Sequence, residues 1–144
     1  MRALVVASAL LGLLLVAAGA AGAHAVPIEA NRQWQSALLY GFVHTLAAIA
    51  AAILPFRNLL QFASGWAFVL SVVLFSGMQI GKIMLAGIPM VPTPLDNLTF
   101  LVPIGGVAFI VGWLLLGLSA AMSPGSQGQV AEGQPVEEEQ VGGD

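Results

Sequence analysis

Long uncharged stretches dominate the pattern of hydrophobic and polar residues along this chain. They cover residues 3–28, 33–56, 58–81 and 97–131 and consist mainly of Leu, Val, Ala, Ile and Gly. A helix needs about 20 apolar residues to cross about 30 Å of hydrocarbon. Charged side chains are rejected from the bilayer core by roughly 2.5–3.5 kcal/mol each on insertion scales. Because each stretch is long enough, the pattern predicts up to four transmembrane helices.

The expected fold is an all-α integral membrane protein, a four-transmembrane-helix bundle with a disordered C-terminal tail. A single transmembrane domain covers residues 1–122, since four spans with short connections leave no room for a second core. The segment 123–144 is rich in Gly, Gln, Pro and Glu and cannot bury enough apolar surface to order itself. The expected helices cover about residues 3–22, 36–56, 59–82 and 98–122.

Polar and turn residues set the expected connections. The segment 26–35 reads as a short interfacial connection, in which Trp34 suits the level of the lipid headgroups. Pro55 and Arg57 end the second helix. The segment 86–97 contains Pro89, Pro92 and Pro94 and predicts an extended loop.

The first uncharged stretch has two interpretations. Leu4 to Val16 matches the apolar region of a signal peptide in length, and Ala23-His24-Ala25 matches a peptidase cleavage site. Glycine and alanine also allow membrane helices to pack closely, so the same residues suit a helix end. The residues alone leave both interpretations open, and cleavage would leave a secreted or periplasmically anchored protein with three helices.

Composition and charge exclude several functions. The chain has 144 residues, of which 58% are hydrophobic and only 8% charged, against roughly a quarter charged in a soluble domain. With no cysteine, it has no disulfides, thiolate metal sites or cysteine nucleophiles. Four scattered Lys and Arg residues cannot form a basic patch for nucleic acid. Five of the seven acidic residues lie in the last thirteen positions, namely Glu132, Glu137, Glu138, Glu139 and Asp144.

Membrane orientation depends on where the four basic residues fall. With four helices, both termini lie on one side, with Arg2 and Arg57, while Arg32 and Lys82 lie on the other. The positive-inside rule therefore gives a tie. From the amino-terminal Arg2 we expect a multi-pass protein of the bacterial plasma (inner) membrane with cytoplasmic termini.

Glycines in the later helices indicate helix packing. Gly77 and Gly81 form a G-x-x-x-G spacing, which lets two helix backbones approach. We favour packing within the bundle over a dimer seam, because neighbours are available within the chain. Pro103, Gly105 and Gly106 near the start of the fourth helix predict a kink or a close helix contact.

Polar side chains within the predicted spans are candidates for a site, since such groups are costly in a membrane and often functional. Tyr40 and His44 are four residues apart and share a helix face, which Gln35 and Ser36 extend. With residues of the third helix they would form a small polar pocket that binds a ligand or relays protons; those residues are Ser71, Ser76 and Gln79. The competing interpretation is interhelical hydrogen bonding, at about 0.6 kcal/mol per bond.

Cofactor and enzyme chemistry are not predicted. His44 lies about 12 Å into its expected helix, whereas His24 lies near the same surface. This difference in depth disfavours a shared metal or haem. We expect no enzyme, because Glu29 and Asp96 lie outside the hydrocarbon region and no Ser–His–Asp set can form. Asp96 could instead pair with Lys82 at the surface.

Several ordered motifs resemble a known family, the small bacterial membrane proteins of "domain of unknown function 423", which are related to the eukaryotic transmembrane protein 256. The family's G-A-F-G-A-H-A is matched by residues 19–25, including Gly22 and His24, except at Ala21. Its Tyr and His four residues apart are matched by Tyr40 and His44. F-S-G corresponds to residues 75–77, and T-P-I-G-G with G-W corresponds to Pro103, Ile104, Gly105 and Gly106 with Gly112 and Trp113, where Val102 replaces the Thr.

This resemblance implies four transmembrane helices with the first retained, and it supplies no activity. We therefore predict a structural or accessory role in the lipid bilayer, with packing through Gly22, Gly77, Gly81, Gly105 and Gly106. A homo-oligomer or another membrane protein are possible partners. The main alternative is a small channel, permease or ligand-binding protein with a polar pocket around Tyr40 and His44. The motif residues of unassigned role are Gly22, His24, Tyr40, His44, Ser76, Gly77, Pro103, Gly105, Gly106 and Trp113.

Overall fold

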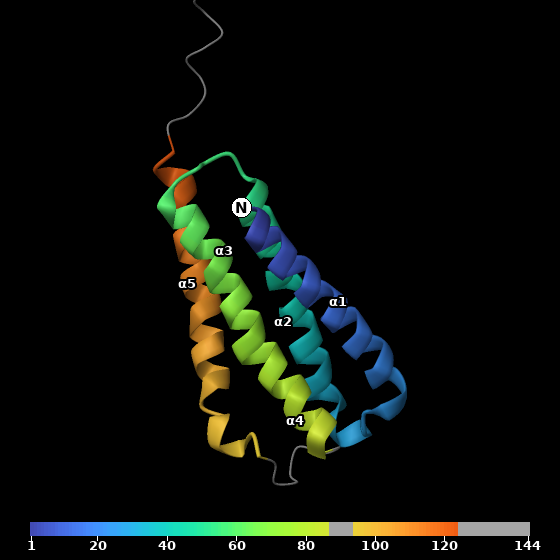
Figure 1. Ribbon diagram of the computed structural model, residues 1–144. Helices are drawn as coiled ribbons and strands as arrows, with labels where there is room; N and C mark the ends of the chain where they lie inside the picture. The colour runs from blue at the N-terminus through green and yellow to red at the C-terminus, as the bar shows by residue number, and fades with distance from the viewer. Residues whose placement is uncertain (87–93, 124–144) are drawn as a thin grey trace, which may run out of the picture.

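The computed structural model describes residues 1–86 and 94–123, and all regular structure within them is helical (Figure 1). Helices α3 and α4 continue each other through the π-helical segment η1 and form one rod from Leu59 to Ala86. The elements are α1 (Arg2–Ala25), α2 (Ile28–Ile53), α3 (Leu59–Ser71), η1 (Val72–Gly77), α4 (Met78–Ala86), the short 3-10 turn η2 (Asp96–Leu98) and α5 (Leu101–Ala121).

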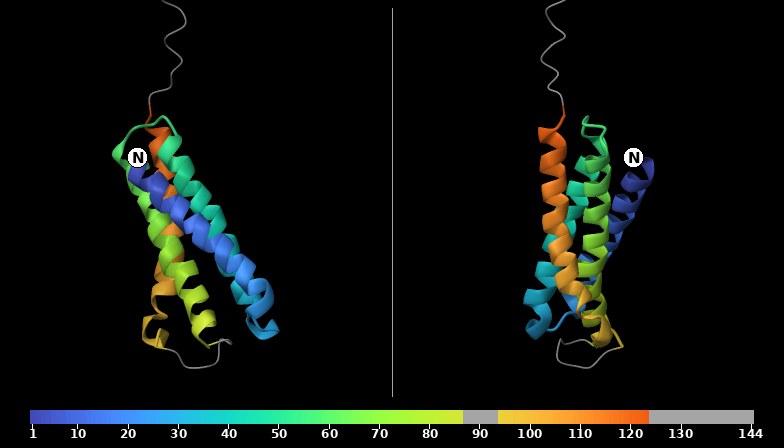
Figure 2. Two further views of the ribbon diagram at one scale, coloured as in Figure 1. Left: turned by 45° about the vertical axis from the view of Figure 1, so that its right-hand side comes forward. Right: turned by 90° about the vertical axis from the view of Figure 1, so that its left-hand side faces the viewer.

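The described helices run alternately up and down in one elongated bundle (Figures 1 and 2). Helix α1 packs along α2, and α3 packs against both α2 and α5. The N-terminus, the turn between α2 and α3, and the end of α5 lie at the same end of the bundle. Four described segments, those beginning at Arg2, Ile28, Leu59 and Asp96, are long and apolar enough to cross a membrane, as the uncharged stretches predicted.

Large side chains fill the spaces left beside glycines, here called glycine holes, and these contacts hold α1 and α2 in the bundle. A Cβ on Gly22 would clash with the indole of Trp34, and one on Gly65 would clash with Leu4. A Cβ on Gly41 would lie 2.7 Å from Leu15. Small residues thus let large apolar ones fill the space between helices, which is the main source of helix association where the surrounding solvent is itself apolar.

The rod formed by α3, η1 and α4, called the third rod below, also packs against α5 through glycines. A Cβ on Gly105 would lie 2.7 Å from the backbone nitrogen of Phe75, and one on Gly112 would lie 2.6 Å from the Phe68 ring. Gly105 therefore meets the prediction of a close helix contact near Pro103. Pro103 itself is the third residue of α5, where a missing N–H removes no intrahelical hydrogen bond.

The turn between α2 and α3 is closed by a polar group that we call the Asn58 cluster, formed by Asn58, Gln61 and Ser119. The buried Gln61 amide donates to the carbonyl oxygens of Ala51 (2.7 Å) and Leu54 (2.6 Å), and its oxygen accepts from the Arg57 backbone N–H. The Asn58 side chain caps α3 by accepting from the Gln61 N–H at 2.9 Å.

The same cluster joins this turn to α5. The Asn58 amide donates to the Ser119 carbonyl at 3.1 Å, and the Ser119 hydroxyl donates to the Asn58 oxygen at 2.8 Å. Arg57 adopts a left-handed backbone (φ 49°), a conformation uncommon for a residue with a Cβ. The Gln61 oxygen holds its N–H there, so the cluster fixes a tight turn and binds three helices at once.

The expected start of the second helix is wrong. Helix α2 begins at Ile28, so most of the expected connection 26–35 is helical and only Val26 and Pro27 separate α1 from α2. Trp34 is 1% exposed and fills the space at Gly22 of α1. The reason is length: α2 has 26 residues and exceeds the ~20 needed to span hydrocarbon, so its polar first turns extend beyond the hydrocarbon.

Three of the glycines expected to pack helices do not do so. A Cβ on Gly77 would meet only a carbonyl of its own rod at 3.9 Å, and one on Gly106 would meet nothing within 4 Å. Gly81 would meet only the Leu95 side chain, at 3.3 Å, outside the helices. The G-x-x-x-G spacing is therefore not a helix-packing face here. The predicted tail lies outside the described residues except for Ser123, and residues 87–93 of the predicted loop also lie outside them.

Candidate functional site

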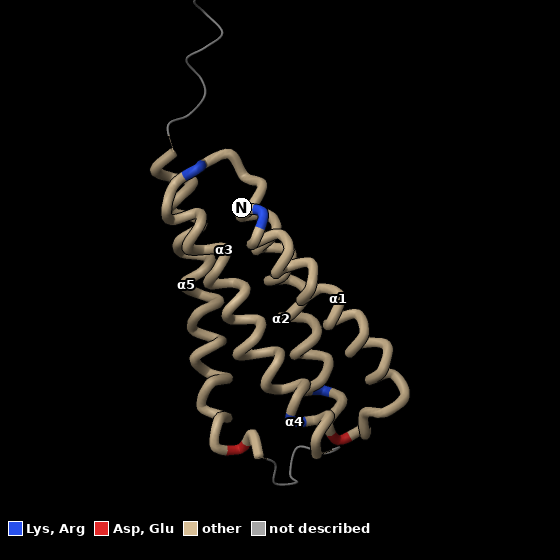
Figure 3. Tube along the Cα trace, in the orientation of Figure 1, with Lys and Arg blue, Asp and Glu red and all other residues tan. Residues whose placement is uncertain are grey.

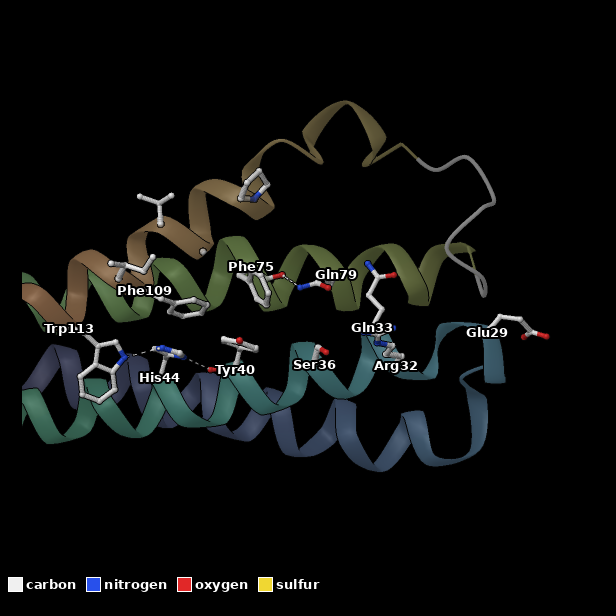
Figure 4. A pocket seen from close by; sticks show the side chains of 14 residues that line it. Glu29, Arg32, Gln33, Ser36, Tyr40, His44, Phe75, Gln79, Phe109 and Trp113 are labelled. Carbon is white, nitrogen blue, oxygen red and sulfur yellow. Dashed lines mark hydrogen bonds between the residues drawn. The ribbon is translucent and has the colours of Figure 1, made fainter.

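A groove of about 910 Å³ runs along the bundle between α2 and α5 (Figure 4). The third rod contacts both helices, whereas the backbones of α2 and α5 have little direct contact. We call this feature the α2–α5 groove. It is lined by Glu29, Arg32, Gln33, Ser36, Tyr40 and His44 of α2, by Phe75 and Gln79 of the third rod, and by Pro103, Gly106, Val107, Phe109, Ile110 and Trp113 of α5.

The two sides of the groove differ in chemistry. On α2 the lining residues follow one face of the helix and all carry a polar group, from Glu29 through the adjacent Arg32 and Gln33 to His44. On α5 the same spacing gives mostly apolar residues, such as Val107 and Ile110. Figure 4 shows the labelled α2 side chains along one side of the groove. A ligand lying along it therefore meets polar groups on one edge and hydrocarbon on the other.

His44 closes the inner end of the groove. Its Nε2 lies 3.2 Å from the Trp113 Nε1, and its Nδ1 lies 2.8 Å from the Tyr40 carbonyl oxygen. An indole N–H can only donate, so Nε2 must accept, and the ring proton lies on Nδ1 and is donated to Tyr40. The histidine is thus a neutral imidazole with both nitrogens satisfied, which joins α2 to α5.

Aromatic rings surround this histidine. The Phe109 ring stacks on His44 with centroids 3.7 Å apart, and the Tyr40 ring lies nearly parallel to it at 5.9 Å. Phe68 and Trp113 pack edge to face with centroids 5.1 Å apart, and Phe68 fills the hole at Gly112. Within the described residues, the groove reaches no further than His44 and Trp113, and this packing lies directly behind them.

The outer end of the groove carries both signs of charge. Glu29 and Arg32 are exposed on the first turns of α2, and no ion pair joins them to each other within the described chain. Charged residues of the described segments lie near the two ends of the bundle (Figure 3). At the end where α2 begins, Lys82 pairs with Asp96 at 2.7 Å, as predicted, and bonds Thr99 at 3.0 Å.

The structure brings together five of the ten motif residues at the groove: Tyr40, His44, Pro103, Gly106 and Trp113. Two others are packing positions, Gly22 beside Trp34 and Gly105 beside Phe75. Gly77 lines a separate, smaller apolar pocket on the side of α1.

The remaining two motif residues, His24 and Ser76, do not line the groove. His24 is exposed in the last turn of α1, far in depth from His44, which lies in the middle of α2. The hydroxyl of Ser76 is buried and has no hydrogen-bond partner among the described residues, and the same holds for Thr45.

The expected polar pocket also differs in its third-helix members. Gln79 lies in the groove and its amide donates to the Phe75 carbonyl at 3.3 Å. Ser71 instead donates to Ala67 within its own helix at 2.6 Å. Sequence reasoning missed Glu29 and Arg32 as parts of the site. The signal was present, because both continue the spacing of Ser36 and Tyr40, but a helix assumed to start at residue 36 excludes them.

The fold and its surface define the class of protein. Most large apolar side chains of α1 and α5 face outward, which suits a lipid bilayer and not water. This is an integral membrane protein with an all-helical transmembrane bundle.

The chain belongs to the family described as "protein of unknown function (DUF423)", whose profile matches residues 18–106. It is 30% identical to a UPF0382 membrane protein of Staphylococcus saprophyticus over 81% of this chain and 94% of that protein. It is 29% identical to the UPF0382 membrane protein YwdK of Bacillus subtilis over 83% and 97% of the two chains. No solved structure matches the chain.

Proposed function

We propose that this protein is a binding protein of the bacterial plasma (inner) membrane that holds an elongated amphiphilic molecule in the α2–α5 groove. The observation that carries the proposal is the groove itself, with a polar edge on α2 and an apolar edge on α5. Its volume of about 910 Å³ lies in the range of small-molecule sites, roughly 300–1,000 Å³. Contact with hydrocarbon alone would leave the polar edge unsatisfied at a cost.

A purely structural role and a transport role fit the groove less well. Packing explains the glycine holes and the Asn58 cluster, but it does not require an open groove with polar side chains along it. A channel needs a continuous path, whereas the groove ends at His44 and Trp113, behind which Phe68 fills the hole at Gly112. A site closed at its inner end suits binding.

We propose further that the protein is not an enzyme. Glu29 lies fifteen residues before His44 on α2, which corresponds to about 22 Å along the helix. This carboxylate therefore cannot orient or activate His44. Both nitrogens of His44 are already engaged, with Tyr40 and Trp113.

The proposal is tested by a substitution that places a large side chain in the groove. Gly106 and Gly117 both lie on α5, and a Cβ on either would meet nothing within 4 Å, but only Gly106 lines the groove. Native mass spectrometry of protein purified in mild detergent should show an adduct of defined mass on the wild type and on Gly117→Leu. Gly106→Leu should lose it. Equal adducts on both variants, or none on the wild type, would contradict binding in the groove and favour a structural role.

We also propose that the termini are cytoplasmic. Arg2 and Arg57 lie at the terminal end of the bundle and Arg32 and Lys82 at the opposite end, so the proposal rests on the amino-terminal Arg2. The chain contains no cysteine, so single cysteines report topology directly. Asn97→Cys should react with a membrane-impermeant maleimide in intact cells, and Met122→Cys only after permeabilisation. The reverse result would contradict this orientation.

A further inference from the structure

We infer that the ligand is a phospholipid with a primary amine in its headgroup, held with one acyl chain in the α2–α5 groove. This inference rests on the proposed function and names the chemistry of its ligand. It follows from the charges at the outer end of the groove, from the length of the groove, and from the difference between its two sides.

The charges at the outer end match a zwitterion. Arg32 presents a guanidinium, whose fixed N–H donors suit a phosphate, and Glu29 presents a carboxylate three residues earlier on α2. Neither is in an ion pair with another described residue. The nearest additional cation on this side, Lys82, is paired with Asp96, so one anionic and one cationic partner remain for a headgroup. A purely anionic headgroup would meet the Glu29 carboxylate as a like charge.

The length of the groove matches the thickness of one leaflet of the bilayer, including its headgroups. Its lining extends on α2 from Glu29 to His44, about 22 Å along the helix. Half of a hydrocarbon core of about 30 Å is about 15 Å, which leaves about 7 Å of the lining, little more than one turn of α2 from Glu29, at headgroup level. A lipid of that leaflet can therefore place its phosphate near Arg32 and one chain against Val107 and Ile110, with the chain end beside His44.

The polar edge favours the glycerol ester region of a lipid over a plain hydrocarbon. Ser36 and Gln33 lie between the charged residues and Tyr40 on α2. Both have N–H or O–H donors that can bond ester carbonyl oxygens. At the amine, a primary ammonium offers three N–H donors to Glu29, whereas a trimethylated ammonium offers none. The site should therefore distinguish phosphatidylethanolamine from phosphatidylcholine.

The experiment uses the full chain in vesicles containing equal parts of phosphatidylethanolamine, phosphatidylglycerol and phosphatidylcholine. Lipids retained after extraction are identified by native mass spectrometry. We expect the wild type to retain about ten times more phosphatidylethanolamine than phosphatidylcholine, the discrimination that one charge-assisted contact can give. Arg32→Gln should lose this enrichment, while Arg2→Gln, which removes a cation at the opposite end, should keep it. Glu29→Gln should favour phosphatidylglycerol.

The outcomes separate this inference from the proposed function. If Gly106→Leu loses all bound lipid but the retained lipid of the wild type has the bulk composition, the groove binds and the headgroup inference is wrong. Enrichment of phosphatidylglycerol or phosphatidylcholine by the wild type would overturn it too. If Gly106→Leu retains lipid as the wild type does, the groove is not the site and both proposals fail.

Discussion

The two ends of the bundle differ in how their polar side chains are arranged. At the turn between α2 and α3, the Asn58 cluster joins three helices, and each of its side-chain amides is hydrogen-bonded. At the other end, α2 and α5 are separated by the groove, and polar side chains line a space that no described residue fills. One end is closed by polar groups that satisfy one another, and the other leaves polar groups facing outward.

This difference separates packing from binding. Polar residues in a membrane protein serve stability where they are buried and satisfied, as Gln61 is, because an unsatisfied partner would be costly. They indicate a site where they line accessible space, as Ser36 and Tyr40 do. Substitutions at the closed end should therefore lower the free energy of unfolding, and substitutions in the groove should mainly change what is bound.

The largest loss of stability is expected for Gln61→Leu. It would leave the Ala51 and Leu54 carbonyls and the Arg57 N–H without their partner, at roughly 1–3 kcal/mol for each unsatisfied group. Thermal unfolding in detergent, followed by circular dichroism, should show a large drop in the midpoint. Gln35→Leu is the control, because Gln35 is exposed and, within the part of the chain that the structure describes, hydrogen-bonds only to Asn31. Similar midpoints for the two variants would show that the cluster does not stabilise the closed end.

A smaller loss is expected at one of two adjacent glycines. Gly105→Ala places a methyl group 2.7 Å from the Phe75 backbone nitrogen, and overpacking of this kind costs roughly 1–3 kcal/mol. Gly106→Ala meets nothing within 4 Å and should gain about 0.5–1 kcal/mol from the lower flexibility of alanine. Unfolding midpoints should therefore shift in opposite directions. A loss at Gly106 as large as at Gly105 would contradict the open groove.

The smallest effect on stability is expected for Trp113→Phe, which keeps an aromatic ring and removes the hydrogen bond to His44. Such bonds between membrane helices contribute about 0.6 kcal/mol. Trp66→Phe is the control, because Trp66 is 36% exposed and its one ring contact among the described residues is edge to face with Phe62. The unfolding midpoint should fall slightly for the first variant and remain constant for the second. No difference between them would show that the inner end of the groove is held by packing alone.

The uncharged stretches predicted the transmembrane spans, because charged residues are excluded from the bilayer core and their absence can be seen in a single sequence. The Tyr40–His44 face was also predictable, since spacing along one helix fixes which side chains share a face. The Lys82–Asp96 pair was predictable as well, because both ends of the intervening loop lie at the same surface.

The partners of these residues across helices could not be predicted. That His44 meets Trp113, or that Gly22 receives Trp34, depends on the rotation of each helix about its axis, which no periodicity within one helix reveals. The π-helical turn in η1 changes that rotation within the third rod. Ser76 lies in this turn beside Gly41 of α2, whereas Phe75 and Gln79 line the groove.

The most direct test of the central claim is a photocrosslink from the groove. A benzophenone amino acid at Val107, which lines the groove, is compared with one at Val111, which lies one turn along α5 outside it; both valines are exposed. After illumination in native membranes, mass spectrometry identifies the lipid attached at each position. We predict one defined lipid class at Val107 and the bulk lipid mixture at Val111. The same bulk mixture at both positions would contradict a specific binding groove.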